Sequence, residues 1–259
     1  MLEELFAGSI EDAKRRSEQV SLSQVEKSAL DAPAVLDALD FLKPSTSVKI
    51  LAEVKRASPS KGEMAEIPDP AHLAGIYADN GASAISVLTE ERKFKGSLAD
   101  FDAVRSRVAV PLLRKDFIAN EYQILEARAH GADIILLIVA GLDIKVIRRL
   151  KEFTEQLGMT AFIETHSEYE LMQAQEVEGK MIGINARDLS TFETDRNLFS
   201  KLAPMLPANV IKVAESAVRT AADVHHYRAS GADVVLVGEA LVTNDPALML
   251  KSFLAPASL

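Results

Sequence analysis

Short apolar runs, many of them β-branched, alternate eight times with helical patterns between residue 48 and the end of the chain. Strands separated by one helix each must run parallel. Eight such units fit a closed barrel or a doubly wound sheet, and their number favours the barrel. The length of 259 residues agrees with one (β/α)8 domain, which takes roughly 250 residues. We predict an α/β fold, a single TIM barrel over residues 1–259, in which about 1–46 form a helical N-terminal extension.

The sequence pattern also predicts where each element of this barrel lies. Strands are expected near residues 48–55, 84–89, 110–115, 133–139, 159–164, 180–185, 209–214 and 233–238. Helices are expected at residues 70–80, 98–107, 120–130, 143–157, 167–177, 195–205, 220–230 and 246–254. A Gly-Ala dipeptide recurs between helix and strand at Gly81, Gly131 and Gly231. Glycine commonly follows the end of a helix, so this repeat fits repeated strand–helix units.

Composition excludes several classes of function. A net charge of -9 argues against nucleic acid, whose phosphates require a basic surface. The chain has no cysteine, which excludes disulfides, thiolate catalysis and cysteine-bound metals and fits a reducing cytoplasm. The longest apolar stretch, residues 134–142, is less than half of the roughly 20 residues that span a bilayer. Because no His-x-x-x-His pair occurs either, we predict a cytoplasmic protein without a metal, a cofactor or a membrane partner.

Charged and amide side chains stand at the C-terminal ends of many of the predicted strands. These residues are Glu53, Lys55, Lys115, Glu164, Asn185, Arg187 and Glu215. Charges are costly inside a core, and the C-terminal strand ends of a barrel converge on the mouth where active sites form. A structural layer of ion pairs is the alternative explanation. The confinement of these residues to one end of the strands favours a functional site.

Six segments, in order, resemble indole-3-glycerol phosphate synthase, the ring-closing enzyme of tryptophan biosynthesis. They are residues 50–62, 88–97, 113–118, 131–138, 182–189 and 213–216. The resemblance covers nearly the whole chain. It implies a lyase that converts 1-(2-carboxyphenylamino)-1-deoxyribulose 5-phosphate into indole-3-glycerol phosphate by cyclisation, decarboxylation and dehydration. It also implies a small anionic sugar-phosphate substrate and no cofactor.

The resemblance assigns roles to residues at the strand ends. Lys115 matches the general acid of ring closure, and Glu164 matches the carboxylate that assists dehydration. Lys55 matches a lysine that contacts the substrate carboxylate and supplies a second acid. Glu53 and Asn185 match residues that orient these groups and the substrate hydroxyls. A lysine can act as an acid only where burial and neighbouring charges tune its pKa and position.

The substrate phosphate is expected near the loops after the seventh and eighth strands, where backbone amides would bind it. The residues that match the substrate and phosphate site are Ser58, Arg187, Glu215, Ser216, Ala217, Gly238 and Glu239. The family usually has glycine where this chain has Ala217, so a Cβ intrudes there. Glu239 places a carboxylate beside the expected anion, and we expect its side chain to point away.

An apolar slot is expected for the aromatic ring of the substrate. Phe94, Phe117 and Leu136 match the wall of this slot in the family. The N-terminal helix that carries Leu5 resembles the family's extra helix near the mouth, but its sequence also suits a plain amphipathic cap. His166, two residues after Glu164, is within reach of the site, but its position favours a surface-loop residue.

Two other functions remain open at this point. The first is a sugar-phosphate aldolase or isomerase on the same barrel, in which Lys115 would form a Schiff base. The second is a barrel that binds without catalysis, which predicts the loss of Lys115, Glu164 or Lys55, yet all three are present. The sequence does not distinguish a monomer from a weak dimer.

Overall fold

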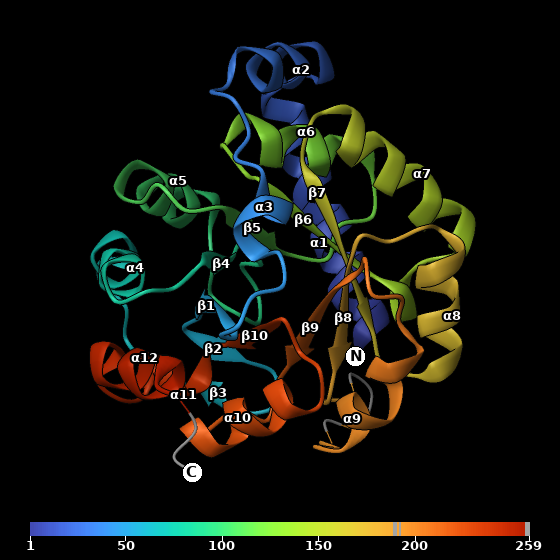
Figure 1. Cartoon of the computed structure of the whole chain (residues 1–259). Coiled ribbons are helices and arrows are strands. Elements are labelled where there is room, and N and C mark those ends of the chain that lie inside the picture. The colour runs from blue at the N-terminus through green and yellow to red at the C-terminus, as the bar shows by residue number, and fades with distance from the viewer. Residues whose placement is uncertain (189–190, 192, 257–259) are drawn as a thin grey trace.

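Eight parallel strands close into a barrel in the order β1-β4-β5-β6-β7-β8-β9-β10, with β10 pairing back to β1 (Figure 1). The computed structural model describes residues 1–188, 191 and 193–256. Leu189, the last residue of one family-like segment, lies outside the described residues. The strands are β1 (Lys49–Val54), β4 (Ala84–Leu88), β5 (Leu112–Lys115), β6 (Ile134–Ile138), β7 (Thr160–Thr165), β8 (Met181–Asn185), β9 (Ile211–Glu215) and β10 (Val234–Val237). The predicted (β/α)8 barrel is confirmed.

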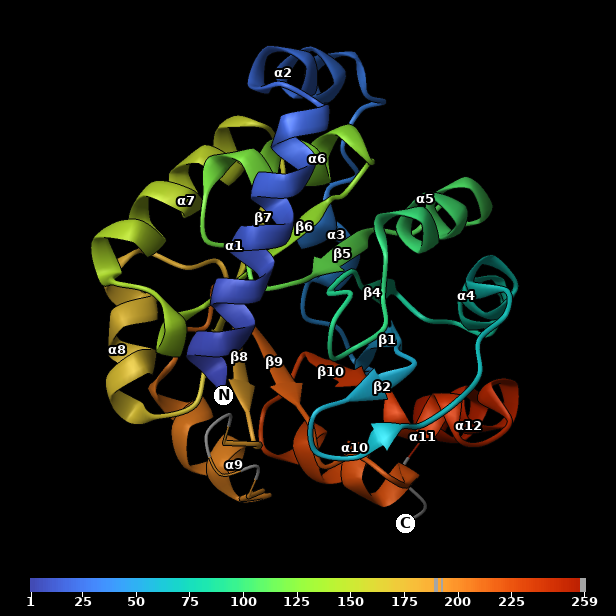
Figure 2. The ribbon, with the colours of Figure 1, turned by 180° about the vertical axis from the view of Figure 1, so that it is seen from behind.

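Helices surround the barrel on all sides (Figures 1 and 2). They are α4 (Pro70–Asp79), α5 (Leu98–Arg107), α6 (Glu121–Ala129), α7 (Ile144–Gln156), α8 (Glu168–Glu176), α9 (Leu198–Leu202), α10 (Ala221–Ala229) and α12 (Pro246–Leu254). Many begin at a side chain that accepts a hydrogen bond from the third helical amide, as Asp69, Ser97 and Ser167 do. No helix among the described residues is long and apolar enough to cross a membrane.

Some local elements differ from the prediction. The helix expected over residues 195–205 is shorter, because α9 gives way to a 3-10 turn, η2 (Ala203–Met205), around Pro204, which has no N–H to donate. The structure also contains elements that the pattern did not predict. They are the hairpin β2 (Ala57–Ser58) and β3 (Gly62–Glu63), the 3-10 turn η1 (Val139–Gly141) and the short helix α11 (Glu239–Val242). These additions follow β1, β6 and β10, so they shape the mouth of the barrel.

Two apolar cores hold the barrel together. The larger lies between the sheet and the helices and includes Ile184, whereas the smaller fills the barrel interior. Because side chains alternate along a strand, interior residues of alternate strands form stacked layers. In β1, β5, β7 and β9 the apolar layer consists of Leu51, Leu113, Phe162 and Val213. Two residues further along the same strands stand Glu53, Lys115, Glu164 and Glu215, as the predicted parity required.

The Gly-Ala-Asp sequence joins α6 to β6 and α10 to β10. Gly131 and Gly231 have φ of 82° and 96°, the left-handed conformation that suits glycine just beyond a helix. The aspartates that follow accept hydrogen bonds from the neighbouring strand. Asp133 accepts from the Leu112 amide at 2.8 Å, and Asp233 accepts from the Lys212 amide at 3.0 Å. The repeat therefore also fixes the starts of adjacent strands relative to one another.

The N-terminal extension packs at both ends of the barrel. It contains α1 (Leu2–Gln19), α2 (Leu22–Asp31) and α3 (Ala38–Leu42). Ala38 and Leu42 of α3 are fully buried in the interior core, next to the starts of the strands. Figure 2 shows α1 in front of β6 and β7, on the opposite side from α3 in Figure 1. In α1, Arg16 donates to both carboxylate oxygens of Glu126, at 2.7 and 2.9 Å.

Candidate active site

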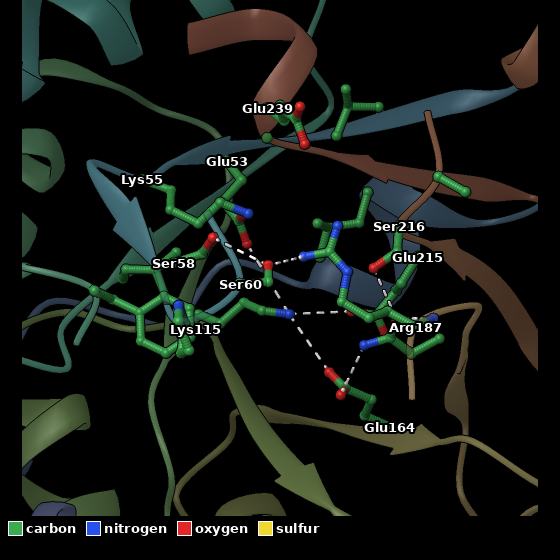
Figure 3. Close-up of a pocket in the computed structure, with 18 of the residues that line it drawn as sticks. Glu53, Lys55, Ser58, Ser60, Lys115, Glu164, Arg187, Glu215, Ser216 and Glu239 are labelled. Carbon is green, nitrogen blue, oxygen red and sulfur yellow. Dashed lines mark hydrogen bonds and ion pairs between the residues drawn. The ribbon is translucent and has the colours of Figure 1, made fainter. Parts of the chain in front are cut away.

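A pocket of about 650 Å³ opens at the C-terminal ends of the strands. Every residue that the sequence singled out as a site candidate lines it. These residues are Glu53, Lys55, Ser58, Phe94, Lys115, Phe117, Leu136, Glu164, Asn185, Arg187, Glu215, Ser216, Ala217, Gly238 and Glu239. Figure 3 shows many of these side chains meeting in one space from different strands. The closed barrel therefore brings the whole predicted set together.

Lys115 stands among three buried carboxylates. Its Nζ lies 3.1 Å from Glu215 Oε2, 3.4 Å from Glu164 Oε2 and 4.0 Å from Glu53 Oε2. The three carboxylate side chains are 1%, 3% and 2% exposed, respectively. Burial opposes the charge on Lys115, but the three carboxylates outweigh it and raise the pKa of Lys115. Lys115 therefore carries its proton at neutral pH.

The two carboxylates nearest Lys115 carry different charges. Burial opposes the ionisation of Glu164, but Lys115, His166 and Asn185 outweigh it and hold the pKa of Glu164 below its usual range. Burial and the charge of Glu164 raise the pKa of Glu215 to about 8, against the effect of Lys115. At neutral pH one carboxyl is thus ionised and the other is protonated, a division typical of acid–base sites.

His166 lies in a bend after β7, as expected of a loop residue, but its side chain faces Glu164 and not the surface. Its side chain is 8% exposed, and Nε2 lies 3.1 Å from Glu164 Oε1. On the other side, Nδ1 lies 3.1 Å from Glu170 Oε2. Strand β7 extends to Thr165, one residue beyond its expected end. Strand alternation continued to residue 166 would have placed His166 on the side of Glu164.

Glu53 forms a second ion pair at the edge of the cluster. Its Oε1 lies 2.6 Å from Nζ of Lys55, the residue just after β1. Gly238, at the end of β10, leaves room for this pair. A Cβ at residue 238 would lie 2.4 Å from Glu53 Oε1 and 3.2 Å from Lys55 Nζ. A larger residue at this position would therefore displace the Glu53 carboxylate.

Asn185 connects the acid–base cluster to the rim of the pocket. Its Nδ2 donates to Glu164 Oε1 at 3.0 Å, and its Oδ1 accepts from Ser216 Oγ at 2.7 Å. The same oxygen accepts from the Arg187 amide at 3.0 Å. The Arg187 guanidinium donates to Ser60 Oγ at 3.2 Å and so reaches the loop after β1. One amide side chain thus fixes the ends of β7, β8 and β9 together.

The chain after β9 makes a left-handed turn at the rim of the pocket. Ser216 and Ala217 have φ of 69° and 59°, a left-handed conformation that L residues rarely adopt. Successive amides in such a turn can form an anion-binding concavity. Three further cations that the sequence did not single out also line the pocket: Lys61, Arg196 and Arg219. Only Lys61 lay inside a family-like segment, so the sequence held little signal for the other two.

Glu239 does not point away from the pocket as expected. It is the first residue of α11, it lines the pocket, and its carboxylate pairs with Lys61 from the loop after β1. Burial opposes its ionisation, but Lys61, Arg187 and Lys55 outweigh it and lower the pKa of Glu239. The correction has a physical reason: Lys61 neutralises the carboxylate, so it can face the pocket without leaving an uncompensated charge there.

One wall of the pocket is apolar. Phe94, Phe117 and Leu136 line it as predicted. The ring of Phe117 packs at 6.0 Å from Phe94 and at 5.5 Å, edge to face, from Phe6 of α1. Leu5, the neighbour of Phe6, also lines the pocket. The N-terminal helix is therefore part of the wall and more than an amphipathic cap, a contact that the sequence pattern alone did not reveal.

Comparison with known proteins identifies the family. The family model described as "Indole-3-glycerol phosphate synthase" matches residues 2–253. The chain belongs to the indole-3-glycerol phosphate synthase family. The indole-3-glycerol phosphate synthase of Leifsonia xyli subsp. xyli is 58% identical over 253 residues, which cover 98% of this chain and 97% of the relative. That of Mycolicibacterium vanbaalenii is 54% identical over 247 residues, which cover 95% and 90%.

Solved structures of more distant proteins share the fold of this indole-3-glycerol phosphate synthase family member. N-acetylmannosamine-6-phosphate 2-epimerase from Clostridium perfringens superposes with a TM-score of 0.62 at 13% identity, over 82% of this chain and 93% of that chain. Thiamine phosphate pyrophosphorylase from Pyrococcus furiosus gives 0.62 at 12% identity, over 80% and 93%. At such low identity these structures support the barrel alone. Among the described residues, no group of three or more His, Asp or Glu side chains could hold a metal ion.

The pKa of Glu215 predicts a pH-dependent effect of Glu215→Gln on stability. Between the usual glutamate pKa and about 8, the folded protein keeps a proton that the unfolded chain has lost. Stability therefore falls as pH rises through this window, and glutamine removes that loss. From about pH 5 to about pH 9 we expect the variant to gain roughly 4 kcal/mol in unfolding free energy relative to wild type.

Urea unfolding at the two pH values measures this difference. Glu91→Gln, which changes an exposed carboxylate paired with Arg15, is the control and should show the same difference from wild type at both. A Glu215→Gln difference that is also independent of pH would mean that Glu215 is ionised in the folded protein.

Proposed function

We propose that this protein is an indole-3-glycerol phosphate synthase, which converts 1-(2-carboxyphenylamino)-1-deoxyribulose 5-phosphate into indole-3-glycerol phosphate, carbon dioxide and water. One observation supports the proposal in addition to family membership. The protonated Lys115 Nζ lies 3.4 Å from the ionised Glu164, beside an apolar wall and several cations. An acid, a base, an aromatic slot and an anion site therefore surround one small volume, which the proposed reaction requires.

Ring closure is assigned to Lys115. The substrate ring carbon that bears the carboxylate attacks the ketone carbon, a carbon–carbon bond forms, and the ketone oxygen takes the Lys115 proton to become a hydroxyl. The raised pKa ensures that this proton is present beforehand. It does not prevent the transfer, because the oxygen that develops negative charge is a stronger base than an amine. Loss of carbon dioxide then leaves its bonding electrons in the ring and restores aromaticity.

Dehydration is assigned to Glu164 and Lys55. The carbon–oxygen bond breaks as the ring nitrogen supplies its electron pair, and the hydroxyl leaves as water with a proton from Lys55. Glu164 then takes the proton from the neighbouring carbon, which completes the indole. Glu53 holds Lys55 at 2.6 Å, and Asn185 holds Glu164 at 3.0 Å, so both groups are oriented before the substrate arrives.

The remaining pocket residues are assigned to binding. The phosphate would lie against the backbone of Ser216, Ala217 and Gly238, with Arg187 and Ser58 as side-chain donors. The aromatic ring would lie in the slot of Phe94, Phe117 and Leu136, Lys55 would contact the substrate carboxylate, and Glu215, protonated at neutral pH, would donate to a substrate oxygen. Figure 3 shows the polar groups from which these assignments start. Whole-chain membership in the family supports a phosphate-bearing substrate.

We further propose that the protein works in the cytoplasm as a monomer or weak dimer, with neither nucleic acid nor membrane as a partner. All predicted site residues line one pocket of a single chain, so no second copy is needed to complete it. Specific activity should therefore be independent of protein concentration while sedimentation velocity shows mostly monomer on dilution. A dimer that persists at the lowest measurable concentration, or activity lost on dilution, would contradict this.

Replacing Lys115 with methionine should abolish indole formation while leaving the chain folded. Methionine keeps the length of the side chain but carries no proton for the ketone, so we expect the rate to fall at least about 100-fold. Indole fluorescence measures the rate with little background, because the protein has no tryptophan. Lys49→Met, at the opposite end of β1, is the control and should keep the wild-type rate.

Other outcomes of the fluorescence experiment would point to other functions. Wild type that binds the substrate without new emission would support a barrel that binds without catalysis. An adduct of Lys115 that sodium borohydride traps during turnover would point to Schiff-base chemistry instead. Wild-type emission that survives in Lys115→Met would show that the acid lies elsewhere.

Ala217→Gly tests the phosphate cradle. Glycine adopts the left-handed conformation without strain and removes the Cβ that faces the expected phosphate. We expect inorganic phosphate to bind about two- to fivefold more tightly. The free energy of unfolding should change by less than about 1 kcal/mol, because the relief of strain is offset by the greater freedom of the unfolded chain.

Ala217→Val provides the opposite change, since a β-branched residue is poorly tolerated at positive φ. It should weaken the binding of inorganic phosphate, and isothermal titration calorimetry with phosphate measures both variants against wild type. If neither variant alters phosphate affinity, the phosphate binds elsewhere in the pocket.

A further inference from the structure

A histidine that is not among the pocket-lining residues holds Glu164 from behind. His166 Nε2 lies 3.1 Å from Glu164 Oε1, on the side away from Lys115, which approaches Oε2 at 3.4 Å. Asn185 donates to Oε1 as well, at 3.0 Å. Nε2 forms no aligned hydrogen bond with any residue that the structure describes, so its contact with Glu164 is an ion pair. The two oxygens of Glu164 thus face cations from opposite sides.

The far side of His166 is held just as firmly. Glu170 Oε2 lies 3.1 Å from Nδ1 and also accepts from the His166 backbone amide at 2.8 Å. Ser167, which caps α8, accepts from the Glu170 amide at 3.2 Å and donates to Glu170 Oε1 at 3.3 Å. Glu170 stands in the first turn of α8, where the helix dipole favours a negative charge. The carboxylate that orients the imidazole is therefore itself fixed.

The charges around His166 favour the imidazolium. Glu164 of β7 and Glu170 of α8 are the charged groups that contact it, one at each ring nitrogen. Lys115 and Glu215 lie beyond Glu164, and Glu215 is protonated at neutral pH. Burial works against the charge, but the two carboxylates outweigh it and raise the pKa of His166 to about 10. A cation therefore stands behind the buried Glu164 at neutral pH.

We propose that His166 is a positioning residue for Glu164, a fixed cation that keeps this carboxylate ionised and facing the pocket after Lys115 has given up its proton. This inference rests on the proposed function. Ring closure turns Lys115 into a neutral amine, which removes one of the two cations beside Glu164. Burial would then favour a protonated Glu164, which could not accept the proton released in dehydration. His166 takes no part in the first step, so its charge remains for the second.

His166→Gln should slow dehydration more than ring closure. Glutamine can still donate to Glu164 but carries no charge. We expect kcat to fall about 10- to 100-fold while KM stays within about twofold, because the side chain does not touch the substrate. The acid limb of the kcat profile should move up by about one pH unit. In a single turnover, carbon dioxide release should precede indole fluorescence by a longer delay than in wild type, since decarboxylation comes before dehydration.

Two further variants make the result specific. Glu170→Gln removes the outer carboxylate and should shift the acid limb in the same direction by a smaller amount. His130→Gln is the matched control, because His130 pairs with Asp102 at the N-terminal end of the barrel, and it should change neither step. A folded His166→Gln variant in which both steps are unchanged, or are slowed equally, would overturn the proposal.

The charge of His166 can be measured without turnover. In the wild-type protein with 13C-labelled histidine, the signal lost in His166→Gln should stay that of an imidazolium up to about pH 9. Titration near the usual histidine pKa would overturn the proposal even in an active enzyme. A wild-type protein that forms no indole would defeat the proposed function, whereas a histidine signal that titrates above about pH 9 would still identify the cation beside Glu164.

Discussion

The ammonium group of Lys115 lies among carboxylates from three other strands, and each of these charges depends on the others. An unpaired charge at this depth would be strongly destabilising, so removing any one partner leaves a cost that the rest must absorb. The four residues belong to alternate strands of the barrel and form one layer above the apolar layer of Leu51, Leu113, Phe162 and Val213. Only the closure of the barrel brings β1, β5, β7 and β9 to one point, which explains why the acid–base group lies at the mouth.

Identical side chains acquire different charges within this layer. Glu164 is ionised because Lys115, His166 and Asn185 approach it, whereas Glu215 is left beside a negative neighbour and keeps its proton. The strand ends that carry these charged groups also anchor neighbouring elements. On β5, Lys115 faces inward while its neighbour Asp116 accepts from Ser9 of α1 at 2.9 Å. The catalytic layer and the N-terminal helix are thus fixed by opposite faces of one strand end, and α1 also supplies Leu5 to the apolar wall.

The predicted site was accurate where the argument was local. Strand parity and the C-terminal position of polar residues predicted Glu53, Lys115, Glu164 and Glu215, because backbone alternation decides which way a strand residue points. The errors involve loops and contacts between distant residues. The side chain of His166 was misjudged, because its position between Glu164 and Glu170 depends on how α8 packs after β7. Glu239 was expected to turn away, because its partner Lys61 lies 178 residues earlier in the chain. No local pattern could show that this lysine would neutralise it.

The sequence by itself determined the alternation of eight strands and helices, the two faces of each strand and the residues that meet at the barrel mouth. It could do so because backbone periodicity and burial depend mainly on neighbouring residues. Only the tertiary structure decided which carboxyl is ionised, that α1 forms a wall of the pocket, and that a histidine supports Glu164. These properties depend on distances of a few ångströms between separate elements, and electrostatic energies change steeply over such distances in a buried site.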